Sequence, residues 1–427
     1  MTVFAVAVFA IAYVLIASEK IHRVTVALSG AGLMLAAGVL DFEGAFHSTE
    51  TGIDWEVIFL LLGMMIIVGV LSHTGVFEYV AIKAVKRVRG RPFRVMALLV
   101  LITAGASALL DNVTTVLLIA PVTLLVCSRL GLNAVPFLLA EVFASNIGGT
   151  ATLIGDPPNI IIAGRGGPSF NDFLVHLTPI VVVLVGALLL LCRVMFRKDF
   201  AYDPARAAEV MELDEREAIN DPRLLVKSGI VLAAVLIGFI TSATTGTAPA
   251  TVALLGAGVL VLISGLPSRD YLADVEAPTL LFFIGLFIMV GALIQVGAIE
   301  RLAELATEAT GGEVQTATFL LLGVSAVLSA VVDNIPYVAT MAPLVETLSQ
   351  STGNPDDVLW WSLALGADLG GNATIIGASA NVVMLGIAEK NGHRITFWQF
   401  AKYGVPVTVV TVLLCVPYLW LRYFVLA

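Results

Sequence analysis

Charged residues are scarce in this sequence. Asp, Glu, Lys and Arg together make up 13% of its 427 residues, whereas apolar residues make up 59%. A soluble domain typically has about 25% charged and about 45–50% apolar residues. A chain of this size has no way to bury so much apolar surface in a water-soluble core. The composition therefore excludes a soluble enzyme and a nucleic-acid-binding protein, and we expect the excess apolar surface to face a lipid bilayer.

Cysteine is also rare. The three cysteines, Cys127, Cys192 and Cys415, lie far apart in apolar stretches. They form neither a disulfide framework nor a zinc-binding spacing, so we interpret them as small buried hydrophobic residues. No nucleophile with a matching base and no phosphate-binding loop is apparent, which argues against an enzyme.

Long apolar segments are what the sequence has in abundance. Each is near the 17–25 residues that cross a bilayer as a helix, and two longer ones contain Gly and Pro clusters that predict broken helices. The first lacks a basic n-region and a cleavage site, so we interpret it as a span and not as a signal peptide. The segments cover residues 2–17, 24–40, 57–72, 93–110, 112–128, 134–162, 174–196, 226–243, 250–265, 278–296, 315–332, 334–349, 358–388 and 403–425.

The chain divides into two similar halves. We expect an N-terminal repeat over 1–196, a polar linker over 197–223 and a C-terminal repeat over 224–427. A shift of 222 residues superposes rare residue types, and such repeats are typical of secondary transporters. The matched pairs include Gly63 with Gly285, Asp111-Asn112 with Asp333-Asn334, Gly148-Gly149 with Gly370-Gly371, Thr152 with Thr374, and Asn159 with Asn381.

Basic residues predict that the repeats have opposite orientations. If 93–128 is a hairpin that enters and leaves on one side, each half has five true spans, and the second half is inverted. With the N-terminus outside, this topology places 20 of the 23 Lys and Arg residues inside, together with the linker 197–223. Such a bias is typical of cytoplasmic loops. We therefore predict an all-α polytopic membrane protein with two inverted repeats, about ten transmembrane helices and two re-entrant hairpins.

The two hairpin tips carry carboxylates. The first tip contains Asp111 and Asn112, and the second contains Asp333 and Asn334. An intramembrane carboxylate costs roughly 2.5–3.5 kcal/mol. One interpretation is that each Asp caps the following helix, and the other is that it binds an ion or a proton. One residue is able to do both. We favour a coupling role for both.

Two polar segments predict discontinuous helices that face these tips at one central site. The first runs from Ser145 to Asn159 and the second from Asp368 to Asn381. Gly-Gly pairs flanked by Thr and Asn unwind a helix, and unwound backbone at membrane depth is tolerated where it lines a cavity. Asp156, which precedes two prolines, is more readily explained as a helix cap than as an ion ligand. The pattern leaves open whether Glu141 is a buried partner or lies near the interface.

The predicted site is acidic. We expect Asp111, Glu141, Asp156, Asp333 and Asp368 to lie within the membrane, and we expect no Lys or Arg at a comparable depth. A site of this charge favours cations or protons, although helix N-termini at the breaks are able to hold an anion. The candidate substrate- or ion-binding residues are Asp111, Asn112, Thr115, Asn146, Gly149, Thr150, Thr152, Asp156, Asn159, Asp333, Asn334, Asp368, Gly371, Asn372, Thr374, Ser379 and Asn381.

Four motifs resemble one family. DNVTTVLLIAPV, ASNIGGTATLIGDPPNIII, DNIPYVATMAP and LGGNATIIGASANVV are similar to the ArsB/NhaD group of the ion transporter superfamily, close to the melanosomal P protein and bacterial arsenite permeases. The resemblance implies inverted repeats, re-entrant hairpins and a homodimer with elevator-like motion. In the related sodium–dicarboxylate symporters, Ser-Asn-Thr tips help bind sodium, which implies a Na⁺ site near Asp111, Asn112, Asp333 and Asn334. Aspartate in place of serine at both tips argues against a dicarboxylate substrate.

Three functions follow as alternatives. The first is a plasma-membrane permease for arsenite, antimonite or another small anion, driven by H⁺ or Na⁺. The second is a sodium/proton antiporter, and the third is a passive chloride or anion channel. We expect no cofactor beyond the coupling ion. A cytoplasmic ATPase subunit that drives transport is a candidate partner. This chain itself contains no Walker motif for ATP hydrolysis.

Overall fold

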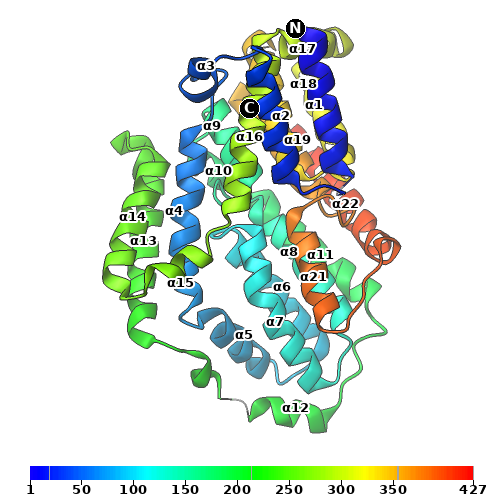
Figure 1. Ribbon diagram of the computed structural model, residues 1–427. Coiled ribbons are helices and arrows are strands. Elements are labelled where there is room, and N and C mark those ends of the chain that lie inside the picture. Colours follow the sequence, from blue (N-terminus) through cyan, green and yellow to red (C-terminus); the bar gives the residue numbers. More distant parts are fainter. Residues whose placement is uncertain (19, 213, 353–354, 427) are drawn as a thin grey trace.

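Helices dominate the computed structural model, which describes residues 1–18, 20–212, 214–352 and 355–426 (Figure 1). No β-strand occurs within these ranges, which confirms the all-α class. The helices of the first half are α1 Thr2–Ala17, α2 Arg23–Ala36, α3 Phe42–Phe46, α4 Trp55–Ser72, α5 Val76–Arg87, α6 Pro92–Ser107, α7 Asn112–Leu130, α8 Ala134–Gly149, α9 Pro157–Gly166, α10 Phe170–His176 and α11 Thr178–Met195. After α12 Pro204–Met211, the second half has α13 Pro222–Thr245, α14 Pro249–Ser264, α15 Ser268–Ala273, α16 Ala277–Gln295, α17 Ala298–Thr310, α18 Val314–Ser329, α19 Asn334–Thr352, α20 Val358–Gly370, α21 Ser379–Lys390 and α22 Phe397–Trp420.

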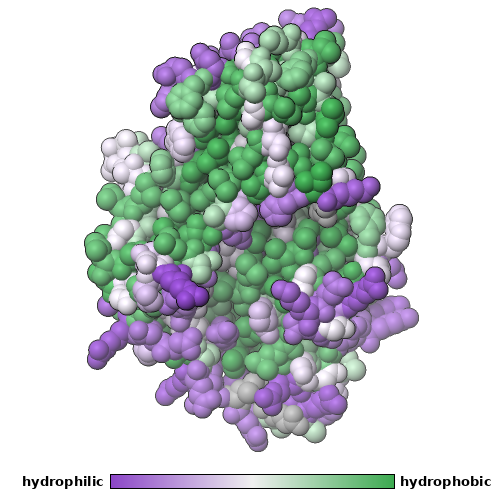
Figure 2. All heavy atoms as spheres, viewed as in Figure 1, coloured by the Kyte–Doolittle hydropathy of each residue, from purple (hydrophilic) through white to green (hydrophobic). Residues whose placement is uncertain are grey.

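Six helical segments of the described chain are long and apolar enough to cross a membrane. A seventh is added if α17 and α18, which meet at a bend of 114°, form one span. Several shorter helices are also apolar, namely α1, α2, α6, α8, α14 and α20. Apolar side chains cover much of the visible surface, and polar ones gather toward its ends and in a patch at mid-height (Figure 2). The expected total of ten spans depends on these shorter helices and stays a prediction.

The helix bounds follow the offset seen in the sequence. Adding 222 to Pro92–Ser107 and to Asn112–Leu130 gives the bounds of α18 and α19. Both long polar segments are broken as predicted, because α8 ends at Gly149 before α9 begins, and α20 ends at Gly370 before α21 begins. The opposite orientation of the halves, the re-entrant nature of the hairpins and the domain division at 197–223 stay predictions.

The two halves interlock through glycine contacts. Helix α4 packs against α14 of the other half, and α16 packs against α2. A Cβ atom on Gly63 would lie 2.8 Å from the carbonyl carbon of Ala253, and one on Gly285 would lie 2.7 Å from that of Ala27. Glycine thus lets the backbones approach closely, as small residues do between membrane helices.

Gly285→Ala should destabilise the protein. The added methyl group would overlap the α2 backbone, and overpacking typically costs about 1–3 kcal/mol. Gly323→Ala in α18 is the matched control, because nothing lies within 4 Å of its Cβ position. Thermal unfolding in detergent measures both, and an equal Tm for the two variants would contradict the close-packing role.

The polar linker docks on the end of α5. The Lys86 Nζ atom lies 2.5 Å from Oε2 of Glu215, and this hydrogen bond holds the pKa of Glu215 below its usual range. The backbone N–H of Asn220 donates to the carbonyl of Thr74 at 3.0 Å. In Figure 1, α12 of the linker lies at one end of the molecule and α17 at the other.

Surface labelling tests the predicted orientation of these two ends. Cysteines introduced at the exposed positions Ala205 in α12 and Ala309 in α17 should react differently with an impermeant thiol reagent in intact cells. Ala309→Cys should be labelled from outside, and Ala205→Cys only after the membrane is opened. The native cysteines are buried and give little background. Labelling of Ala205→Cys in intact cells would reverse the topology.

Candidate functional site

Four helix N-termini converge in the interior. Helix α7 packs against α21, and α9 packs against α19. The N–H of Asn334, the first residue of α19, donates to the carbonyl of Gly377 just before α21 at 3.2 Å. The residues that begin α7 and precede α9 are also in contact, through Asn112 and Asp156. The positive ends of four helix dipoles therefore point into one region.

Asp156 lies at the centre of this region, and its side chain is fully buried. The amide Nδ2 of Asn112 donates to it at 2.8 Å, and that of Asn334 lies 3.2 and 3.3 Å from its two oxygens. Both hairpins therefore reach the same carboxylate. The interpretation of Asp156 as a helix cap is wrong, because its side chain makes no capping bond to α9. Pro157 and Pro158 occupy the first two helical positions and offer no N–H for a cap.

An asparagine network joins the two broken helices. Asn146 of α8 donates from Nδ2 to Oδ1 of Asn372 at 3.0 Å and to Oδ1 of Asn381 at 3.1 Å. Asn381 in turn donates to the carbonyls of Gly371 and Thr374 at 2.7 and 2.8 Å. In the first half, Asn159 donates in the same way to Gly149 and Thr152 at 3.3 and 3.0 Å. Four of the predicted amides thus hold the unwound backbone and each other.

Asp368 is the second fully buried carboxylate. Among the described residues, neither of its oxygens has a hydrogen-bond partner. Its polar neighbours are Thr150 and Asn159, and the carboxylate repels that of Asp156. The Oδ1 atom of Asn159 is likewise buried without a donor within the described chain. Buried oxygen atoms without a donor are costly, so these atoms are candidates to receive a proton or to bind a cation.

Two more predicted polar residues are buried in the same core. The Thr115 hydroxyl has no hydrogen-bond partner among the described residues. Glu141 of α8 accepts a hydrogen bond from the Thr123 hydroxyl, while its Oε2 lacks a partner in the described part of the chain. Since Glu141 is 1% exposed and accepts from Thr123, it is a buried partner of α7.

The predicted threonines near the breaks bond to backbone carbonyls, and their role in binding stays a prediction. The Thr152 hydroxyl donates to the carbonyl of Ala108 at 2.5 Å, and that of Thr374 donates to Ala330 at 2.6 Å. Each bond ties an unwound loop to the neighbouring hairpin tip. Thr150 donates back to the carbonyl of Asn146 at 3.0 Å, as a hydroxyl within a helix commonly does.

The two tip aspartates have different partners. Asp111 accepts from the N–H of Thr114 at 3.0 Å and also from its hydroxyl, so its role as the cap of α7 is confirmed. Asp333 instead pairs with Nη1 of Arg23 at 3.0 Å and accepts from the Ser379 hydroxyl at 2.5 Å. The coupling role predicted for both aspartates stays a prediction.

Arg23 corrects the expectation that no basic residue lies at the depth of the site. The sequence places it at the start of an apolar segment, which by the inside bias of basic residues predicted a cytoplasmic loop. In the structure, Arg23 is the first residue of α2, reaches Asp333 and Ser379, and lies over the ring of Phe282 at 5.2 Å. The one feature of the sequence that pointed to a basic residue at the site was Asp333, because a buried aspartate needs a partner. Nothing in the sequence says which of 23 basic residues supplies it.

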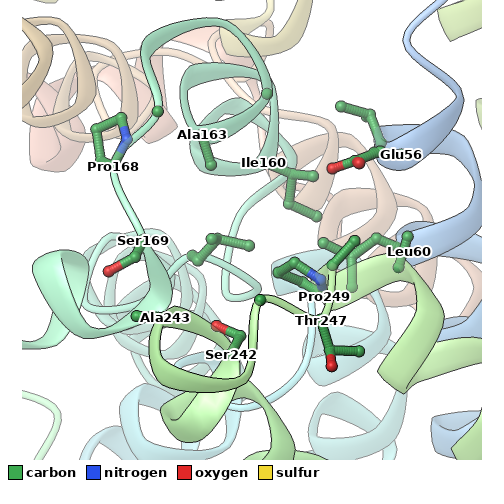
Figure 3. Close-up of a pocket in the computed structure, with 17 residues that line it drawn as sticks. Glu56, Leu60, Ile160, Ala163, Pro168, Ser169, Ser242, Ala243, Thr247 and Pro249 are labelled. Carbon is green, nitrogen blue, oxygen red and sulfur yellow. The ribbon is translucent and has the colours of Figure 1, made fainter.

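Two similar pockets flank the core. One, of about 320 Å³, is shown in Figure 3, where Glu56, Ser169 and Thr247 are among the polar residues that line it. The other, also about 320 Å³, is lined by Arg23 and Asp333. Leu60 and Ile160 of the first pocket correspond to Phe282 and Val382 of the second at the offset of 222. Pro249, the first residue of α14, stands in the first pocket where α2 has Arg23, so the two pockets differ in charge.

Arg23→Ala should destabilise the protein more than loss of a surface ion pair. It leaves Asp333, whose side chain is 14% exposed, without its cation. Breaking a fully buried pair costs about 3–5 kcal/mol, and partial exposure should reduce this to about 1–2 kcal/mol. Arg301→Ala is the control, since it breaks an Arg–Glu pair that is more than half exposed. Equal thermal stability of the two variants would show that the Arg23–Asp333 pair contributes nothing.

An all-helical membrane protein whose broken helices meet at a buried polar centre has the architecture of a transporter. The comparisons specify which one. The chain belongs to the CitMHS family of citrate transporters, whose model matches residues 13–366, and it is therefore a multi-pass membrane transporter.

Relatives and solved structures agree with this assignment. The chain is 57% identical over its full length to a 46 kDa membrane protein of Mycobacterium leprae and 58% identical to an uncharacterized transporter of Mycobacterium tuberculosis. It is 34% identical to the human P protein, over 99% of this chain and 60% of the P protein. The expected similarity to the P protein is thus confirmed, while membership of the ArsB/NhaD group stays a prediction.

The fold is shared with two solved transporters. The YdaH transporter of Alcanivorax borkumensis matches with a TM-score of 0.59 over 85% of this chain and 84% of its own, at 15% identity. MtrF of Neisseria gonorrhoeae matches with a TM-score of 0.59 over 87% of this chain and 81% of its own, at 12% identity. At these identities the likeness concerns the fold alone.

Proposed function

We propose that the chain is a proton-coupled secondary transporter of the plasma membrane that moves a small anion, in which Asp368 carries the proton beside Asp156. The observation that carries this proposal is the buried carboxylate of Asp368, which has no hydrogen-bond partner in the described chain and lies near enough to Asp156 for the two charges to repel each other. Two such charges are costly at membrane depth unless a proton or cation joins them.

The equivalent position in the first half favours a proton. Asn146 corresponds to Asp368 at the offset of 222 and donates to Asn372 and Asn381. Asn159, which corresponds to Asn381, lies beside Asp368 with an Oδ1 atom that lacks a donor. A protonated Asp368 supplies an O–H at the place where Asn146 supplies an N–H. Sodium is the alternative, since the same carboxylate and amide oxygens are acceptable ligands for it.

The helix N-termini support an anionic substrate. The first turns of α7, α9, α19 and α21 point into the core, and discontinuous helices present such ends to anionic groups in other transporters. The buried Nδ2 of Asn372 has no acceptor in the described chain and is a candidate donor to the substrate. Asp333, which by its charge argued against a dicarboxylate, is offset by Arg23. Citrate, the substrate in the family's description, is therefore the first anion to test, followed by dicarboxylates and arsenite.

A sodium/proton antiporter is the second candidate function. The acidic centre alone supports it, because Asp156 and Asp368 suffice to bind either cation. An antiporter exchanges sodium for protons without any anion, whereas the first candidate function requires an anionic substrate. A passive anion channel fits less well, because unpaired carboxylates repel anions unless they are neutralised. The homodimer and the ATPase partner stay predictions that this proposal does not require.

Asp368→Asn should abolish proton-driven uptake and leave the protein folded. The amide keeps the shape and the hydrogen-bond donor of a protonated carboxyl, as Asn146 provides in the other half. It has no proton to release. In proteoliposomes with an imposed pH gradient, uptake of labelled citrate should fall by about tenfold or more, while citrate exchange at equal pH should survive. Asp156→Asn should also impair coupling, whereas Asp111→Asn should retain it, since Asn caps a helix almost as well as Asp.

Several outcomes separate the alternatives. Uptake that follows a sodium gradient and not a pH gradient would replace the proton by sodium. Sodium/proton exchange without any anion would favour the antiporter. Normal coupling in Asp368→Asn and Asp156→Asn, with loss in Asp111→Asn and Asp333→Asn, would return the coupling role to the hairpin tips.

A further inference from the structure

Four arginines line one pocket away from the central site. Arg91 and Arg94 lie at the start of α6, and Arg193 and Arg197 at the end of α11. The pocket has a volume of about 610 Å³, and its remaining walls include aromatic side chains. The residues that line this pocket play no part in the transport mechanism proposed above.

The pocket carries uncompensated positive charge. Within the described residues, none of the four guanidinium groups forms a salt bridge. The nearby acidic residues on the same segment have other partners: Asp199 accepts from Asn133 at 3.5 Å, and Asp203 pairs with Arg206 at 3.6 Å. The first turn of α6 also lacks a side-chain cap, which adds free backbone N–H groups beside the arginines.

Aromatic contacts shape the walls. The Arg193 guanidinium lies 5.1 Å from the centre of the Phe93 ring, and Phe93 contacts Phe200 edge-on at 5.5 Å. These contacts position Arg193 above an apolar floor. Guanidinium groups bind phosphate oxygens in a bidentate manner, so arginines arranged around a concave surface suit a phosphate group.

An exposed apolar stripe leads away from the pocket. Leu190 and Val194 are each 68% exposed and share a face of α11 with Arg193. On α6, which packs against α11, Leu101 is 49% exposed and lies two turns beyond Arg94. Side chains of this kind at the surface of a membrane helix face acyl chains. The polar pocket and the apolar stripe together match a headgroup followed by its hydrocarbon tails.

We propose that this pocket binds the phosphate of an anionic phospholipid, with the acyl chains lying along α6 and α11. Basic pockets between transmembrane helices bind anionic headgroups in this way. Free phosphate shares the headgroup chemistry, but it makes no use of the apolar stripe.

Lipid retention by the purified full-length protein tests this proposal. Native mass spectrometry in detergent, with phosphatidylglycerol or phosphatidylcholine added, measures the bound lipid. The wild type should retain one phosphatidylglycerol per chain in preference to phosphatidylcholine. The variant Arg94→Gln/Arg193→Gln/Arg197→Gln should lose affinity for phosphatidylglycerol by about tenfold or more. Arg87→Gln/Arg223→Gln/Lys390→Gln removes the same charge from exposed positions elsewhere and should bind within about twofold of the wild type.

Three results would overturn the proposal. The first is unchanged phosphatidylglycerol binding in the pocket variant. The second is an equal loss in the control variant, which would mean that only overall charge matters. The third is displacement of the lipid by millimolar inorganic phosphate, which would assign the pocket to the free ion. If the triple variant aggregates, the single changes Arg94→Gln and Arg197→Gln replace it, and unchanged affinity in both would contradict the site.

Discussion

The burial of Asp156 and Asp368 is the constraint on which the rest of the structure depends. A carboxylate at membrane depth costs several kcal/mol unless it is compensated. Asp156 receives amide donors from both hairpins and faces four helix N-termini. Asp368 has no such donor in the described chain. The two buried carboxylates therefore differ, because amide donors stabilise the charge of Asp156 and no hydrogen-bond donor of the described chain does so for Asp368.

The hydrogen bonds that hold the backbone around Asp156 and Asp368 occur in both halves. The two carboxylates themselves do not. Ser107 and Ser329 donate to equivalent carbonyls of α8 and α20 at 2.7 and 2.6 Å, and Thr152 and Thr374 repeat a second tie. A Cβ on Gly148 would lie 2.3 Å from the carbonyl oxygen of Ala104, so this contact also requires glycine.

At the centre the correspondence ends. Asp156 has Ala378 as its counterpart, and Asp368 has Asn146. The repeats thus share the parts that hold the backbone and differ in the groups that bear charge. One asymmetric site therefore results from two similar halves.

Much of this architecture could be predicted from the sequence, because it depends on local patterns. Apolar length predicts the helices, Gly and Pro clusters predict the breaks, and the constant offset predicts equivalent bounds in the two halves. The partners of individual side chains could not be predicted. Asp156 has the local pattern of a cap, and only the three-dimensional structure shows that both tip asparagines reach it. Arg23 and Asp333 are 310 residues apart, and no periodicity relates them.

The Arg23–Asp333 pair also distinguishes the two flanking pockets, because only the second is lined by an ion pair. It connects α2, which packs on α16, to a hairpin tip at the central site. In the first half, α14 begins at Pro249, which has no charged side chain to pair with Asp111. The Asp111 carboxylate instead accepts a hydrogen bond from the first turn of α7. Any motion that separates α2 from the second hairpin must break an ion pair, whereas the equivalent motion of α14 breaks none. The Arg23–Asp333 pair therefore stabilises the described conformation, in which α2 and the second hairpin are in contact.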